Sequence, residues 1–480
     1  MVYQRGTEGS YQEWADTVGD NSYTFDNLLP YFKKSITFTP PNKDTRACNA
    51  TPAYDASVLQ GNGPVSVTFP NYAGAWGTWV VKGLEAIGVK GIKGFNSGAL
   101  IGYAYATFTI NAKNMNRESS ETSFLRSSLQ NPNYIVYQST MAKKIAFNGK
   151  KATGVVVETG GVKYTLSAKK EVIVSAGTFG SPQLLLVSGV GPAADLEKLN
   201  IPVVADLPGV GKNMQDHVFF GPSYRVNAIT TSSLGIPSFA AAAAKNFTES
   251  ATGLMTNPSV DILAWEKVPK SLRGSLSPDT QQALDKYPAD WPELEYLGVH
   301  TYLGLQNNMG SGGPNDGYNY ATLAAAIIKP QSRGTVSISS SDTNDQPLID
   351  PNYFAEKADV EVAIAGYKRL RQFFNSTALD RILISDEVFP GSNVTSDADL
   401  ERVIKTSFNT VFHAACTCSM GKSTDKNAVV DTKGRVFGGV SNLRVVDASI
   451  FPFLPPGHPM STVCKSKPFP SPSLQTVSIF

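Results

Sequence analysis

The residues with the clearest chemical potential lie near the C-terminus, in the stretch NTVFHAACTCSMG at residues 409–421. His413 stands three residues before Cys416, and Cys418 follows two residues later. Such a group could bind a metal through nitrogen and sulfur, place a disulfide beside an imidazole, or supply a general base. The remainder of the chain has to distinguish these possibilities.

The metal and disulfide interpretations are both weak. A structural zinc site needs three or four ligands in a tetrahedral arrangement, and the nearest further cysteine in the sequence, Cys464, lies in a tail of unusual composition. A disulfide between Cys416 and Cys418 would close a very small, strained ring. We therefore predict no metal site, and a general base becomes the favoured interpretation of His413.

Length and composition indicate an ordinary globular protein. The chain has 480 residues, of which 41% are hydrophobic and 17% charged, enough for about two or three domains. Its net charge is +2, and the densest basic stretch, AKKIAFNGKK at 142–151, is typical of a solvated hairpin. Nucleic acid is not an expected partner, and no apolar run approaches the ~18 residues that a membrane span requires. The oligomeric state is left open.

Cysteine and asparagine patterns bear on the cellular location. Four cysteines are too few to indicate a disulfide framework, so they fix no redox compartment. N-x-S/T sequons without proline in the middle predict a glycoprotein of the secretory pathway in the full-length form, and they begin at Asn49, Asn246, Asn375 and Asn393. The opening MVYQRGTEGSYQEW is polar and charged, so we expect no signal peptide in this stretch.

A β-rich region begins at about residue 133. It contains four runs separated by NGK and TGG turns, and the last run, EVIVSAG, precedes a predicted helix. We place the N-cap of this helix at Ser181, with Pro182 as its first residue. A buried strand, a Gly-rich turn and a helix N-terminus form an element that accepts a phosphate or the edge of a flavin.

The other expected elements are more scattered. The patterns predict helices at 76–94 and 359–374 and a strand at 442–449, which precedes a Pro-rich turn. The middle of the chain, about 221–330, is mixed and Gly/Asn-rich in places, which favours loops on a substrate side.

Five motifs in one order give the chain a resemblance to the glucose-methanol-choline (GMC) family of flavin-dependent alcohol oxidoreductases. They are GTFGSPQLLLVSGVG (177–191), GVGKNMQDH (209–217), SRGTVSI (332–338), FHAACTCSMG (412–421) and RVVDASIFPFLPPGHPMSTV (444–463). The stretch TGLMTNPSVDILAWEKVP (252–269) is similar to the fungal branch that contains versicolorin B synthase and patulin synthase.

The resemblance implies an α/β and α+β fold, with an incomplete Rossmann-like FAD-binding domain and a substrate-binding domain of antiparallel sheet and helices. The family's G-x-G-x-x-G turn is absent, and MVYQRG resembles the middle of its first signature. We therefore expect a chain that lacks the N-terminal FAD-binding segment and the native C-terminal helix. The predicted domains are 111–220 with 435–463 for FAD, 1–110 with 221–434 for lid and substrate, and 464–480 as an aberrant tail.

The implied activity is FAD-dependent oxidation of the CH–OH group of a small alcohol, aromatic or from secondary metabolism, with hydride transfer to flavin. By the resemblance, His413 matches the active-site histidine that acts as general base, and His458 matches a position that is His or Asn in the family. His217 follows Asp216, and this pair is interpreted as a structural tie for a loop. His300 has no motif around it and receives no role.

The resemblance also assigns contacts to the cofactor FAD. Ala142 is expected on the strand that passes the adenine, where its backbone would make the contact. The other predicted contacts lie at strand ends or at the start of a helix, and they are Gly177, Thr178, Asp447, Ala448, Pro459, Met460, Ser461 and Thr462.

Two alternatives to oxidation stay open from the sequence alone. The same histidines could catalyse a non-redox cyclisation or isomerisation in secondary metabolism, with FAD held structurally. A third possibility is an inactive truncated fragment that does not hold FAD, because the pyrophosphate turn is missing from the chain.

Overall fold

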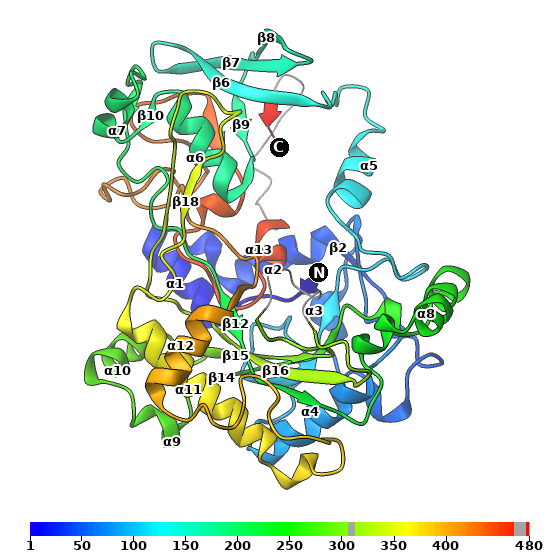
Figure 1. Cartoon of the computed structure of the whole chain (residues 1–480). Helices are drawn as coiled ribbons and strands as arrows, with labels where there is room; N and C mark the ends of the chain where they lie inside the picture. Colours follow the sequence, from blue (N-terminus) through cyan, green and yellow to red (C-terminus); the bar gives the residue numbers. More distant parts are fainter. Residues whose placement is uncertain (306–312, 465–476, 480) are drawn as a thin grey trace.

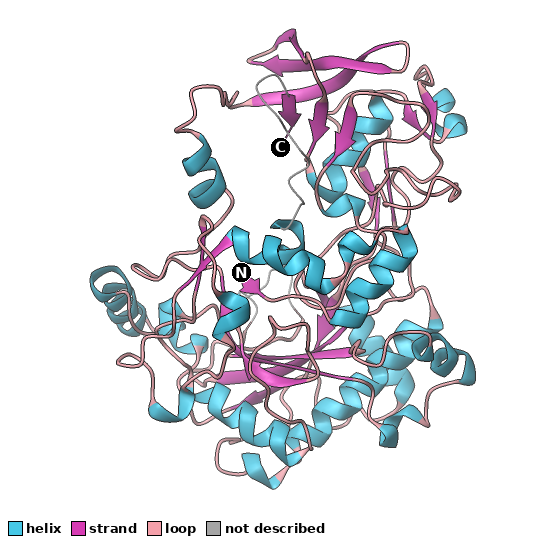
Figure 2. Cartoon of the chain, turned by 180° about the vertical axis from the view of Figure 1, so that it is seen from behind, coloured by secondary structure: helices cyan, strands magenta, loops and turns pink. Residues whose placement is uncertain are grey.

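The computed structural model describes residues 1–305, 313–464 and 477–479. One part of the molecule contains a large sheet with helices beneath it, and the other part holds a β-hairpin layer, short parallel strands and helix α6 (Figure 1). Seen from behind, α2 (Phe25–Ser35) and its neighbours lie between these two parts (Figure 2). No helix among the described residues is long and apolar enough to cross a membrane.

The large sheet is antiparallel and has seven strands. Its order is β19-β12-β16-β15-β14-β4, with β13 paired to β16 outside this path. The bounds are Gly102–Tyr105 for β4, Val218–Phe220 for β12, Ser223–Arg225 for β13, Val260–Glu266 for β14, Leu294–Val299 for β15, Tyr320–Ile327 for β16 and Asn409–Thr410 for β19.

Both faces of this sheet are covered. Along β14, Ile262 and Ala264 pack with helices α4 (Ala75–Ala86) and α11 (Lys357–Phe374), while Leu263 and Trp265 pack into a second cluster on the opposite face. This alternation follows from the two-residue period of a strand. Strands buried on both faces carry few polar residues, so a charged residue in one of them is a sign of function.

The β-rich region predicted from residue 133 contains four strands, as expected, but the first of them begins only at Thr140. They are β6 (Thr140–Asn148), β7 (Lys151–Thr159), β8 (Val162–Ser167) and β9 (Val172–Val174). The first three form antiparallel hairpins, and β9 pairs in parallel with β20 (Leu443–Val445) and β21 (Val477–Ile479). The glycine turns at 149 and 160–161 have positive φ, which explains why the NGK and TGG signals were reliable.

The predicted start of the helix after β9 was wrong. Helix α6 (Gly177–Val187) begins four residues before Ser181, so Pro182 lies inside it. Proline has no N–H to donate to the carbonyl four residues back, and that carbonyl, on Thr178, instead accepts a hydrogen bond from Thr417 Oγ1 at 2.6 Å. Ser181 does not cap the helix, and its hydroxyl donates to Asp447 Oδ2 at 2.5 Å.

The remaining element predictions had mixed outcomes. Helix α11 covers the helix expected at 359–374, α4 covers most of the one expected at 76–94, and β20 lies within the predicted strand. The prediction of loops for 221–330 was wrong, because this region supplies all of β13, β14, β15 and β16. The low β propensity of the Ala-rich β16 sequence, YATLAAAI, hid the strand.

The domain boundaries inferred from the family stay predictions. Helices α1 (Glu8–Val18) and α2 contribute residues to the same apolar cluster as β7, β9 and α6, and β12 lies in the large sheet. Most of the predicted tail, 465–476 and 480, lies outside the described residues.

A lysine at the end of β16 is enclosed by aromatic rings. The Nζ atom of Lys329 lies 4.4 Å from the ring centre of Tyr287, 4.0 Å from that of Trp291 and 4.5 Å from that of Phe453. Cation–π attraction offsets part of the cost of burying this charge. Burial nevertheless lowers the pKa of Lys329 to about 8.

This pKa predicts a pH-dependent contribution to stability. Between pH 8 and 10 the folded protein loses the Lys329 proton while the unfolded chain keeps it, so the free energy of unfolding rises with pH. Over this range we expect the free energy of unfolding of wild type to rise by about 2 kcal/mol relative to that of Lys329→Met, because each pH unit contributes about 1.4 kcal/mol. Urea unfolding of both proteins at pH 8 and 10 measures the difference, and a constant difference would contradict the prediction.

Candidate functional site

The two histidines predicted to be catalytic lie side by side. His413 Nε2 and His458 Nδ1 share a hydrogen bond of 3.0 Å, and their ring planes are inclined by 82°. His413 belongs to the loop after β19, whereas His458 precedes helix α13 (Met460–Cys464). Two motifs far apart in the sequence therefore place imidazole nitrogens at one point.

Asp216 fixes the loop that carries His413. Its carboxylate accepts hydrogen bonds from the backbone N–H of His413 at 2.8 Å, from Thr410 Oγ1 at 2.5 Å and from Tyr353 Oη at 2.7 Å. Burial raises the pKa of Asp216, and these hydrogen bonds oppose that rise because they favour the ionised form. The loop tie expected from the sequence for Asp216 is thus present as a set of direct contacts.

Two further groups extend the histidine pair, and the sequence did not assign either of them to the site. His217 Nδ1 lies 3.0 Å from His413 Nδ1, and Glu295 Oε1 lies 3.0 Å from His458 Nε2. Glu295 lies within β15, a strand whose residues are all buried, and its side chain is fully buried. A glutamate in such a strand is the signal that could have identified it.

Burial controls the charge of these groups. It lowers the pKa of His413 well below its ordinary value, with further lowering by His458 and His217, and it lowers the pKa of His217 to about 3. Burial also raises the pKa of Glu295, although His458 opposes this change. His217 and His413 are therefore neutral at neutral pH, and a neutral imidazole can accept a proton.

Some predicted cofactor contacts gather at the ends of β9 and β20. Asp447 Oδ2 accepts the backbone N–H of Gly177 at 2.9 Å, and Thr178 Oγ1 donates to the carbonyl of Ala414 at 2.7 Å. The carbonyl of Ala448 accepts the N–H of Cys416 at 3.1 Å. The turn at the start of α6 is thus connected to the loop that carries His413.

A second group of predicted contacts lies at the start of α13. Ser461 Oγ donates to the carbonyl of Gln4, and Thr462 Oγ1 shares a hydrogen bond of 2.7 Å with Tyr11 Oη. The side-chain amide of Gln4 is fully buried, and neither its oxygen nor its nitrogen has a hydrogen-bond partner among the described residues. An unpaired buried amide is costly, so it indicates a polar ligand on this side of α13.

The open space around Gly177 is a second indication of a bound ligand. Its φ is +76°, and no atom lies within 4 Å of the position that a Cβ would occupy. Ala142 differs from the other predicted contacts, because its carbonyl already accepts a hydrogen bond from Thr343 Oγ1 at 2.9 Å. Its role toward the adenine therefore stays a prediction, as do the roles of Pro459 and Met460.

The cysteines of the motif are buried thiols. Burial raises the pKa of both Cys416 and Cys418, which makes them unreactive at neutral pH. Within residues 1–305, 313–464 and 477–479, no group of three potential ligands could hold a metal ion.

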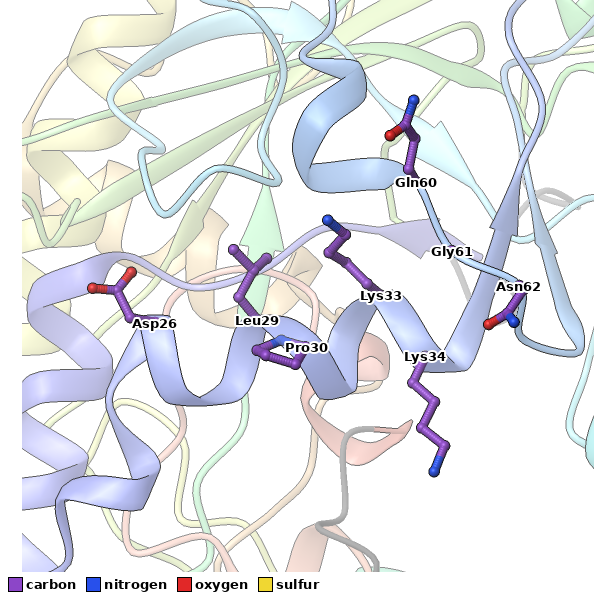
Figure 3. Close-up of a pocket in the computed structure, with 8 residues that line it drawn as sticks. All are labelled: Asp26, Leu29, Pro30, Lys33, Lys34, Gln60, Gly61 and Asn62. Atoms are coloured by element: carbon purple, nitrogen blue, oxygen red, sulfur yellow. The ribbon is translucent and has the colours of Figure 1, made fainter.

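A separate groove of about 440 Å³ lies between α2 and the loop after α3 (Ala56–Leu59). Figure 3 shows its lining, which consists of Asp26, Leu29, Pro30, Lys33, Lys34, Gln60, Gly61 and Asn62. None of the predicted catalytic or cofactor residues belongs to this lining. The stronger candidate site is therefore the set of contacting side chains of His217, His413, His458 and Glu295, here called the histidine array.

Comparison with known proteins identifies the class. Two GMC oxidoreductase family models match residues 1–219 and 330–465, and the chain belongs to this family. Patulin synthase from Penicillium expansum is 55% identical over 465 residues, which span 96% of this chain and 74% of that protein. Versicolorin B synthase from Emericella nidulans is 42% identical, over 96% of this chain and 72% of that protein.

A solved structure supports the same fold. An FAD-dependent oxidoreductase from Chaetomium thermophilum superposes with a TM-score of 0.86 at 28% identity, over 97% of this chain and 82% of that one. The family resemblance inferred from the five motifs is thus confirmed, and so is the predicted mixture of α/β and antiparallel architecture. The chain is an FAD-dependent oxidoreductase related to fungal enzymes of secondary metabolism.

Proposed function

We propose that the protein oxidises the CH–OH group of a small alcohol and that His413 accepts the hydroxyl proton. The observation that carries this proposal is the 3.0 Å contact between His413 Nε2 and His458 Nδ1, next to the buried start of α13. A hydroxyl group that opens this contact would meet two imidazole nitrogens at once. One nitrogen can accept its proton while the other donates a hydrogen bond to its oxygen.

The residues present fit FAD. When bound, FAD supplies the acceptor for the hydride that leaves the alcohol carbon. The turn at Gly177 and Thr178, the strand end at Asp447 and Ala448, and the helix start at 459–462 would hold it. The unpaired amide of Gln4 would contribute a further polar contact.

The substrate class rests on the relatives. Patulin synthase is 55% identical to this chain over the aligned residues, and versicolorin B synthase is 42% identical. We extend from them to an alcohol of secondary metabolism, aromatic rings included.

Product mass and flavin absorbance test the proposal together. The purified protein, supplied with FAD, is mixed anaerobically with a panel of benzylic, allylic and polyketide-derived alcohols. We expect bleaching of the oxidised flavin bands and a product lighter by two hydrogen atoms. An unchanged oxidised spectrum with every alcohol would count against the proposal.

A second candidate is a cyclisation or isomerisation without net redox change. The similarity to versicolorin B synthase favours it, since neutral histidines in one array can move protons without any hydride acceptor. Loss of water, or no change in mass, with an unbleached flavin would identify this reaction.

We also propose that the protein passes through the secretory pathway and carries N-glycans. All four sequon asparagines are exposed, at Asn49, Asn246, Asn375 and Asn393. By contrast, Asn257 heads an N-P-S triplet that proline disqualifies, and it is buried. Treatment of secreted protein from a fungal host with an N-glycosidase should increase its gel mobility, and an unchanged mobility would contradict the proposal.

A further inference from the structure

Three imidazoles and one carboxyl group form an unbranched array. Successive contacts join His217 to His413, His413 to His458, and His458 to Glu295, each at 3.0 Å. Every nitrogen of His413 and His458 is used within this array. The hydrogen positions in neighbouring contacts are therefore coupled, because each contact holds one hydrogen and a neutral imidazole carries only one N–H.

The backbone holds His217 firmly at one end. Strand β12 pairs with β16 in a register that joins Val218 to Ile327, and the carbonyl of His217 accepts the N–H of Val411 at 2.8 Å. The ring of His217 is fully buried and is inclined by 79° to that of His413. The sheet therefore fixes the backbone of His217, and the buried ring lies with its Nδ1 atom 3.0 Å from Nδ1 of His413.

The two ends of the array favour the same hydrogen positions. Among the described residues, Nε2 of His217 has no hydrogen-bond partner of standard geometry, and the backbone of Ile328 favours the protonated form of this ring. At the other end, Glu295 is fully buried and its Oε2 has no hydrogen-bond partner in the part of the chain that the structure describes, so its protonated form costs less than a carboxylate. A protonated Glu295 donates to His458 Nε2.

We propose that His217 is a positioning residue, which accepts a hydrogen bond from Nδ1–H of His413 and thereby keeps the lone pair of His413 on Nε2. His458 then carries its hydrogen on Nδ1, toward His413, and His217 carries its hydrogen on Nε2. This inference rests on the proposed function, because a lone pair on His413 Nε2 is what a base at this point requires. His458 becomes the hydrogen-bond donor to the alcohol oxygen.

The opposite set of hydrogen positions would place the proton-accepting nitrogen on a different histidine. If Glu295 were ionised, His458 would donate Nε2–H to it, His413 would donate Nε2–H to His458, and His217 would donate Nδ1–H to His413. The accepting nitrogen would then be Nδ1 of His458, and Nε2–H of His217 would be absent. The tautomer of one ring therefore distinguishes the two arrangements.

Nitrogen NMR of the histidine rings tests the proposal without any measurement of activity. The chain has only four histidines, so ¹⁵N labelling of histidine gives four imidazole patterns, and single variants assign them. We expect the Nδ1–H tautomer for His413 and the Nε2–H tautomer for His217. An Nε2–H or doubly protonated His413 in the wild-type protein would overturn the proposal.

Two substitutions at His217 separate positioning from simple packing. In His217→Asn, the side-chain oxygen lies close to the position of Nδ1 and can still accept from His413, so the tautomer should persist. In His217→Leu the acceptor is lost, the Nε2–H form of His413 should appear, and kcat should fall about 10-fold with little change in KM. His300, which lies outside the array beside Asp261, should keep its pattern in both variants.

The outcomes also separate this proposal from the proposed function. If the tautomers are as expected but no alcohol is oxidised, the positioning role stands and the reaction is wrong. If His217→Leu leaves the tautomer of His413 unchanged, the positioning role is wrong whatever the activity. Should His217→Leu fail to fold, the wild-type and His217→Asn spectra still decide.

Discussion

Replacement of His413 with alanine is expected to lower turnover by about 100-fold or more while FAD stays bound, because general-base catalysis contributes about 10²–10⁴. The side chain contacts His217 and His458, whereas the loop is held through the backbone N–H of His413. Alanine keeps that N–H, so Asp216 should continue to fix the loop. Steady-state kinetics and the ratio of flavin to protein absorbance measure the two quantities separately.

A matched control is available at His300. This ring is also buried, yet it lies beside Asp261 and has no contact with the histidine array. His300→Ala removes an imidazole of equal size, so it should reduce stability without a comparable loss of kcat in the folded protein. Simultaneous loss of flavin and turnover in His413→Ala would make His413 a structural residue.

The sequence predicted those parts of the molecule in which local chemistry dictates the outcome. The glycine turns between β6, β7 and β8 require positive φ, and α11 has regular apolar spacing, so each element follows from its own residues. The pairing of His413 with His458 was expected only through the family resemblance. Nothing in the spacing of two motifs that lie 45 residues apart could establish a 3.0 Å contact.

The failures have physical causes that lie outside the local sequence. The early start of α6 depends on Thr417, a distant residue that satisfies the carbonyl left free by Pro182. The Ala-rich β16 is a strand because neighbours cover both its faces, although its intrinsic propensity is low. Tertiary context therefore overrode propensity in both elements.

Glu295 and His217 illustrate the same limit at the candidate site. Glu295 is polar in a strand that is otherwise apolar, and His217 follows an aspartate in a loop-like motif. Neither residue indicates its partner through its local sequence, and each contacts a motif histidine only because β15 and β12 bring it there. The sequence predicted His413 and His458 through the family resemblance, whereas the contacts of His217 and Glu295 with them could be found only in the structure.

Asp447→Ala is expected to weaken FAD binding by about 100-fold. The carboxylate accepts the N–H of Gly177, the hydroxyl of Ser181 and, through Oδ1, the N–H of Ser449. Hydrogen bonds to a charged group are each worth about 1.5–3 kcal/mol, and about 1.4 kcal/mol corresponds to a tenfold change in affinity. Loss of this acceptor releases the turn at the start of α6, so ordering that turn would consume part of the binding free energy.

Titration of the FAD-free protein with FAD, followed by flavin fluorescence, measures this affinity. Asp425→Ala is the matched control, since Asp425 also accepts a backbone N–H two residues ahead, from Asn427, but is exposed and distant in sequence from the cofactor residues. It should bind FAD as tightly as wild type. Equal affinity in Asp447→Ala and Asp425→Ala would show that the strand end at Asp447 does not shape the cofactor site. A selective loss of affinity in Asp447→Ala, with unchanged FAD binding in His413→Ala, would instead show that Asp447 supports cofactor binding. The role of His413 would then be limited to proton transfer.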